Sequence, residues 1–175
     1  MVQFKAISRL QTPEEMMALY RRNTGQFQKE VLKGIAAVVV QNSPVDTATY
    51  VSSHSVGGGG RDRTFPGAGR TTSAGKPRNQ NAEAARGAAL ASLVAQIDQL
   101  GDDIQNPMLR NASEHAWRVE YGGWGEGTQN RAVGRDRLTE EMQAELGKQP
   151  YFVYTKARAQ APAIIADVKA RLGLE

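Results

Sequence analysis

The segment at residues 69–76 holds the first side chains whose types could bind a phosphate group. A P-loop has four residues between its two glycines and a Ser or Thr directly after its lysine. In this chain five residues separate Gly69 from Gly75, and Pro77 follows Lys76. The hydroxyl that would bind a metal ion is therefore missing. No Gly-x-Gly-x-x-Gly fingerprint lies between a strand and a helix either, so the sequence predicts no nucleotide site.

Histidines and carboxylates could bind a metal or transfer protons, but here they form no catalytic pattern. The two histidines, His54 and His115, lie outside any His-Glu-x-x-His spacing, and we interpret them as packing or surface residues. The chain lacks the Gly-x-Ser-x-Gly sequence of a serine nucleophile. Adjacent carboxylates lie at expected helix or turn ends, where capping and solvation explain them: Glu14 and Glu15, Asp102 and Asp103, Glu140 and Glu141. We therefore expect no enzyme, no metal and no cofactor.

The elements of the chain are organised around a turn that joins a helix to a strand. Pro44 lacks an amide hydrogen and forces Ser43 out of the helical region, so the preceding helix must end near Asn42. Asp46 and Thr47 can then bond neighbouring amides and fix the reversal. The β-branched and hydroxyl-rich residues 49–56 are expected to form a strand. Taken by itself, the string Ser-Pro-Val-Asp-Thr is more typical of an ordinary turn.

Helix signals are clearest at the N-terminus. Thr12, Pro13 and Glu15 are typical of an N-cap, a first helical position and a capping box, so a helix is expected from residue 12 to about residue 42. Gly25 weakens its middle, and a kink or two shorter helices remain open. A second, alanine-rich helix is predicted from residue 81 to a C-cap at Gly101, with one apolar face: Ala82, Ala85, Ala89, Leu93, Ile97 and Leu100.

The C-terminal half is expected to contain strands and a closing helix. Residues 108–111 fit a short strand, and residues 115–121 alternate Trp117, Val119 and Tyr121 with charged side chains, which predicts a half-buried strand. A short helix fits residues 138–146, and the terminal helix is expected to be interrupted or shifted near Pro162. The predicted fold class is α+β: a small antiparallel sheet packed against a long N-terminal helix, the Ala-rich helix and a C-terminal helix.

Composition bounds the class of protein. With 175 residues and 40% hydrophobic content, residues 1–175 suit a single domain. The sequence has no cysteine, no apolar run long enough to span a membrane and no signal-peptide pattern at its N-terminus, so we expect a chain that stays in the cytoplasm where it is made.

Most of the net charge of +4 lies in residues 57–80, which contain almost no aliphatic side chain. A segment of this composition buries too little to offset its ordering entropy, so we predict a flexible basic arm. Such an arm can contact phosphates without reading sequence, or acidic patches on a neighbouring subunit; a solvated loop is the alternative. Trp124, in a glycine-rich turn, is a candidate interface anchor. The basic residues of the arm are Arg61, Arg63, Arg70, Lys76 and Arg78.

The order of these motifs resembles the neck and tail-completion (head-tail joining, tail-component) proteins of long-tailed bacteriophages. That family tends to show a long amphipathic N-terminal helix, a Pro-Val-Asp-Thr-Gly turn leading into a strand, an aromatic strand ending in Glu-Tyr-Gly or Glu-Phe-Gly, and a last helix. This chain has Ala48 where the family has glycine, His115-Ala116 where it often has Tyr-Ala, a longer arm, and a polar insertion at residues 123–147. The matching stretches are Pro44-Val45-Asp46-Thr47, Val119-Glu120-Tyr121-Gly122 and Gln149-Pro150-Tyr151-Phe152, the last of which precedes the closing helix.

The resemblance implies a non-enzymatic structural protein of the virion. Such subunits assemble as a ring, typically a hexamer, at the head-tail junction around the DNA channel. Its partners would be the head-side connector or adaptor, the tail terminator or tail tube, and the DNA in the channel. Two alternatives stay open at this point: a tail terminator that caps the tail tube, and a nucleic-acid-binding protein that is not part of a virion.

Overall fold

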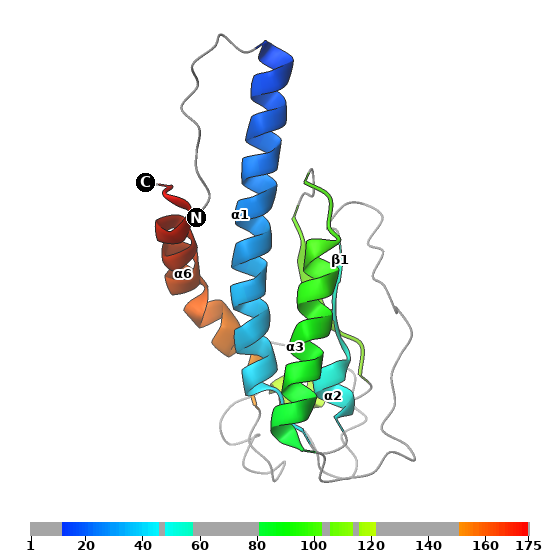
Figure 1. Ribbon diagram of the computed structural model, residues 1–175. Coiled ribbons are helices and arrows are strands. Elements are labelled where there is room, and N and C mark those ends of the chain that lie inside the picture. Colours follow the sequence, from blue (N-terminus) through cyan, green and yellow to red (C-terminus); the bar gives the residue numbers. More distant parts are fainter. Residues whose placement is uncertain are drawn as a thin grey trace, which may run out of the picture.

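The computed structural model describes residues 12–45, 48–57, 81–102, 106–113, 116–121 and 151–174. These residues form helices packed around a small sheet, so the α+β prediction is confirmed (Figure 1). The predicted short helix at residues 138–146 lies outside the described residues. In chain order the elements are α1 (Pro13–Asn42), α2 (Thr49–Ser52), β1 (His54–Gly57), α3 (Ala82–Asp98), β2 (Met108–Asn111), α4 (Ala116–Tyr121) and α6 (Val153–Leu172).

Helix α1 begins and ends where its sequence signals predict. The Thr12 hydroxyl accepts a hydrogen bond from the Glu15 amide at 3.2 Å, and the Glu15 carboxylate accepts one from the Thr12 amide at 2.9 Å. This is a complete capping box with Pro13 at the first helical position. At the other end, Ser43 has an extended backbone (ψ 133°), as a residue before proline prefers. Between these ends α1 is one continuous helix.

Gly25 does not divide α1 but lets another segment approach it. A Cβ placed on Gly25 would lie 2.5 Å from the carbonyl oxygen of Asp102, in the chain that follows α3. Gly34 similarly admits α6, since a Cβ there would lie 2.5 Å from the Ile164 Cγ2 atom. Small residues in α1 therefore allow close packing on two sides, and Figure 1 shows α1 between α3 and α6.

The strand predicted for residues 49–56 is wrong in its first half. Residues 49–52 form the single turn α2, and only β1 (His54–Gly57) is extended. The reason is Ala48, whose φ of 57° is left-handed and turns the chain into a helical turn that buries Tyr50 and Val51. A four-residue segment has too little periodicity to reveal this, because burial rather than β-propensity decides its conformation.

The sheet consists of β1 and β2, which pair antiparallel from His54 opposite Asn111 to Gly57 opposite Met108. The prediction of a short strand at residues 108–111 is therefore confirmed. All residues of β1 are buried, and α3 packs against this strand. The Gln96 side chain on α3 accepts a hydrogen bond from the Val56 amide at 3.0 Å, which ties helix to sheet.

The strand predicted for residues 115–121 is also wrong, because residues 116–121 form helix α4. Val119 on this helix is buried against Val39, Tyr50 and Val153. Burial of this one side chain does not require the alternating buried and exposed positions of a strand. The predicted C-cap at Gly101 is wrong too, since α3 ends at Asp98 with Gln99 as its C-cap. Helix α6 continues through Pro162 as one helix, so the interruption predicted there is wrong.

Two hydrophobic clusters pack against α1. One joins α1 to α2, α3 and β1, and its buried members are Leu32, Ala36, Val40, Val51, Val56, Ala89, Leu93 and Ile97. The other joins α1 to α2, α4 and α6, with Val39, Tyr50, Val119, Val153 and Ala157 buried. Helix α1 is thus the element on which both clusters are built.

Candidate functional site

Most residues proposed from the sequence as site residues lie outside the described residues. Of the turn residues, Pro44 is described and follows Ser43, the C-cap residue of α1. The proposed site residues outside the described part of the chain are Asp46, Thr47, the interface candidate Trp124, and the basic residues Arg61, Arg63, Arg70, Lys76 and Arg78. The described residues contain three features to which the sequence analysis assigned no site.

The first feature is a buried polar cluster around His54, at the start of β1. The Nε2 atom of His54 lies 2.8 Å from the Ser43 hydroxyl, and its Nδ1 atom lies 2.9 Å from the Tyr154 hydroxyl. The amide nitrogen of Asn111 lies 3.2 Å from Nδ1 and donates to the Tyr50 carbonyl at 2.7 Å. The rings of Tyr50 and Tyr154 meet the His54 ring edge-on, at centroid distances of 5.1 and 5.7 Å. Five elements or their ends therefore converge on one imidazole.

The hydrogen bonds of this cluster define one tautomer of His54. The Ser43 hydroxyl donates to the Val39 carbonyl at 2.7 Å, so it accepts from an N–H at Nε2 of His54. Nδ1 is then an acceptor, which suits the Tyr154 hydroxyl and the Asn111 amide as donors. The Asn111 amide nitrogen also lies 3.4 Å from Nε2, so it does not distinguish the two ring nitrogens. Neutral imidazole with its proton on Nε2 satisfies the contacts with both hydroxyl groups.

Burial shifts the acid–base behaviour of the cluster in the same direction. Removal from water lowers the pKa of His54 from 6.5 to about 4. Burial also raises the pKa of Tyr50 and, with smaller contributions from Tyr50 and Glu120, that of Tyr154. The histidine and both phenols are consequently neutral at physiological pH.

Ser43 and His54 are within hydrogen-bond distance, as in serine hydrolases, but their geometry does not activate a nucleophile. A general base must accept the serine proton, whereas here the Ser43 proton is held by the Val39 carbonyl and His54 donates to the Ser43 oxygen. Ser43 is fully buried and His54 is 5% exposed. The cluster therefore joins α1, β1, β2 and α6 rather than presenting a reactive group.

The second feature is Glu120, a buried carboxylate in α4 that caps α6. Its oxygens accept hydrogen bonds from the amides of Tyr154 and Thr155, both at 2.9 Å, and from the Thr155 hydroxyl at 2.8 Å. Phe152, the N-cap residue of α6, has a left-handed φ of 49° and no side-chain cap. Glu120 replaces that cap and places a negative charge at the positive end of the helix. This residue belongs to the Glu-Tyr-Gly motif of the resemblance.

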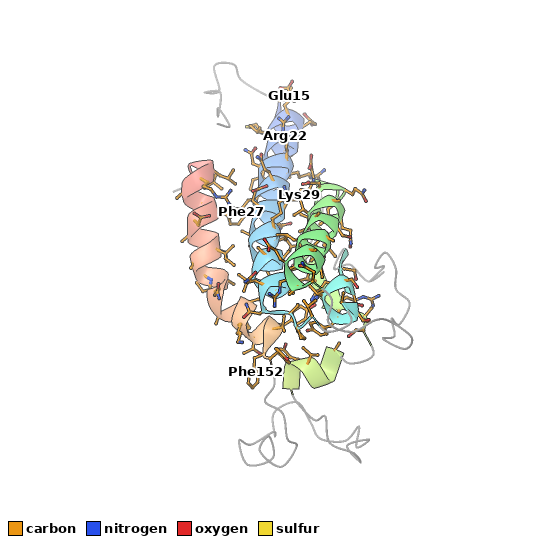
Figure 2. All side chains as sticks on the ribbon, turned by 60° about the horizontal axis from the view of Figure 1, so that its bottom comes forward. Glu15, Arg22, Phe27, Lys29 and Phe152 are labelled. Atoms are coloured by element: carbon orange, nitrogen blue, oxygen red, sulfur yellow. The ribbon has the colours of Figure 1, made fainter. Side chains whose placement is uncertain are left out.

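The third feature is the α1 tip, which we define as residues 13–24. Met16, Met17 and Tyr20 are 51%, 52% and 67% exposed, although each is a large apolar or aromatic side chain. Figure 1 shows this end of α1 extending beyond both α3 and α6, and Figure 2 shows Glu15 and Arg22 on the extension. In the same view Phe27 points toward α6 and Lys29 toward α3. The tip therefore exposes large apolar and aromatic side chains on a helix end that projects from the rest of the described residues.

Ion pairs hold α1 in place just below the tip. Lys29 pairs with Asp102 at 3.1 Å and Lys33 with Asp98 at 2.8 Å, both on the α3 side. The hydrogen bond that Lys33 donates to Asp98 is the main reason why the pKa of Lys33 is raised. On the other side Arg171 of α6 lies 3.5 Å from Glu30. These pairs are partly exposed, so they orient the helices more than they stabilise them.

The described residues contain no cluster of three or more histidine or carboxylate side chains arranged to hold a metal ion. Within the same residues no helix is both long and apolar enough to cross a membrane. Comparison of the chain with protein-family models, with curated proteins and with solved structures gave no match.

Proposed function

We propose that this protein is a structural subunit of a tailed phage particle, which forms a ring at the head-tail junction and completes the tail around the DNA channel. The observation that carries the proposal is the role of the motif residues in the fold. The turn motif and the Glu-Tyr-Gly motif are short strings, and short strings match by chance. What supports the resemblance is that two described residues at these motifs, Ala48 and Glu120, each meet a physical requirement of the fold.

Ala48 is the most informative of these positions. The family has glycine there, and this chain has alanine with a φ of 57°. A left-handed backbone is the conformation in which glycine is favoured over every residue with a Cβ. The turn therefore has the geometry that the family's glycine would serve, even though this chain carries another residue.

Glu120 gives the second motif a comparable reason. Its three hydrogen bonds to the start of α6 give the glutamate of this motif a structural role at the last helix. The α1 tip adds a surface on which subunits can pack, since exposed methionine and tyrosine are enriched in protein interfaces. Gly57 belongs to β1, so under this proposal the arm comprises residues 58–80 and contacts DNA or acidic patches of a neighbouring ring.

The experiment is a knockout of the gene in the phage that encodes it, followed by electron microscopy of the lysate. Full heads and tails of normal length that fail to join are the expected result, with joining restored by the purified protein. Tails of irregular length would instead identify a tail terminator, and normal particles would refute both roles. A variant with Arg61, Arg63, Arg70, Lys76 and Arg78 changed to serine tests the arm, and unimpaired joining would exclude it from the mechanism.

A further inference from the structure

The α1 tip continues a packing face that α6 covers only in part. Apolar or small residues recur along α1 at alternating intervals of four and three, the spacing of a helix–helix seam. Gly34 on this seam receives Ile164 of α6, and Tyr20 lies two heptads before Gly34 on the same face. The seam residues are Met17, Tyr20, Thr24, Phe27, Val31, Gly34 and Val38.

Helix α6 ends before the seam does. Ile164 lies against Gly34 and Arg171 pairs with Glu30, so α6 runs antiparallel to α1. Because each helix rises about 1.5 Å per residue, Leu172 lies opposite about residues 26–29 of α1. The α1 tip therefore extends roughly 18 Å beyond the last turn of α6. On the opposite side of α1, the backbone at Asp102, which follows α3, packs against Gly25.

The charges beside the exposed part of the seam are self-complementary. Glu14 and Arg21 are seven residues apart and lie within about 60° of Met17 around the helix, on the side away from Tyr20. Neither has an oppositely charged residue three or four positions away, so neither forms an ion pair along its own helix. In an antiparallel pair of helices related by a two-fold axis, like edges face each other. Glu14 of one copy then faces Arg21 of the second copy, and the reverse pair forms by symmetry.

We propose that two copies of this chain associate through their α1 tips, packed antiparallel with Met17 against Tyr20 and flanked by two Glu14–Arg21 ion pairs. The tip of the second copy packs on the part of the seam that lies beyond the end of α6, and like α6 it runs antiparallel to α1. A parallel arrangement would set the Glu14 and Arg21 edge against Met16 and Asn23, without charge pairing. The contact is isologous and so differs from the head-to-tail contacts of a ring. It stands independently of the proposed function.

The test is the mass of the purified full-length protein, measured by sedimentation equilibrium from about 1 to about 500 µM, a range suited to a contact of this small size. The Glu14→Arg and Arg21→Glu variants each replace two attractive pairs with two repulsive ones and should raise the dissociation constant about tenfold or more. The double variant, Glu14→Arg with Arg21→Glu, restores both pairs and should restore association. Tyr20→Glu removes the apolar centre of the contact, so this variant should sediment with half the mass of the associated wild type.

Arg22→Glu is the matched control, because it makes the same change of charge on a different side of the helix and should leave association unchanged. Far-UV circular dichroism confirms that each variant keeps its helices. A species that halves in mass in both single variants and returns in the double variant supports the inference. A wild-type chain that does not self-associate, an Arg22→Glu effect equal to that of Arg21→Glu, or no recovery in the double variant overturns it. If the wild type is monomeric and Tyr20→Glu lowers its thermal stability, Tyr20 is covered by another part of the same chain and not by a second copy.

Discussion

Acidification should destabilise this protein through a single buried histidine. The pKa of His54 is about 4 in the folded chain and 6.5 when the residue is exposed in the unfolded chain. The unfolded state therefore takes up the proton first as the pH falls, and stability is complete above pH 6.5 and decreases below it. Between about pH 8 and about pH 5 the loss is about 2 kcal/mol, and it levels off at about 3 kcal/mol once the folded state also binds the proton.

The measurement is urea unfolding followed by far-UV circular dichroism at several pH values, for the wild type and for His54→Gln. Carboxylates titrate in the same window, so the informative quantity is the difference in unfolding free energy between the two proteins. That difference should shrink by about 2 kcal/mol from about pH 8 to about pH 5, because glutamine cannot take up the proton. Parallel pH profiles for the wild type and His54→Gln would refute the description of His54 as a buried neutral imidazole.

Three further predictions test the packing of the helices, each by thermal or urea unfolding. Glu120→Gln should lower the free energy of unfolding by about 1–2 kcal/mol, because an amide offers one acceptor oxygen and no charge to the start of α6. The control Glu83→Gln, in the exposed first turn of α3, should lower it by less than about 0.5 kcal/mol. Equal effects of the two substitutions would contradict the capping role of Glu120. Ala48→Gly should stabilise by about 0.5–1 kcal/mol by relieving a left-handed backbone, and a loss of stability would show that its methyl group matters more. Gly25→Ala should destabilise by about 1–3 kcal/mol through its collision with Asp102, whereas Gly87→Ala, with open space around it, should stabilise by about 0.5–1 kcal/mol.

The elements that local chemistry defines were predictable from the sequence. Thr12, Pro13 and Glu15 satisfy or remove the free amides at the start of α1, and Pro44 ends the helix by restricting the residue before it. These effects act over a few neighbouring residues, so they do not depend on the rest of the fold. The α-helical periodicity of residues 82–98 was visible for a related reason, because one face recurs over several turns.

Short segments were the elements that the sequence misassigned. Residues 49–52 and 116–121 contain β-branched and aromatic side chains typical of strands, yet both are short helices. One or two helical turns are too short to show a period. Tertiary burial of Val51 and Val119 therefore decided their conformation against local propensity.

The polar sites came entirely from the tertiary structure. Ser43, Asn111 and Tyr154 surround His54 from distant parts of the chain, and Glu120 reaches the start of a helix more than thirty residues away. Nothing in a linear string signals that these groups meet, because their hydrogen bonds exist only after the helices have packed. The sequence by itself determined where the long helices form and where α1 begins and ends. Only the tertiary structure decided which polar groups lose water together, since burial depends on contacts between elements that the chain order does not contain.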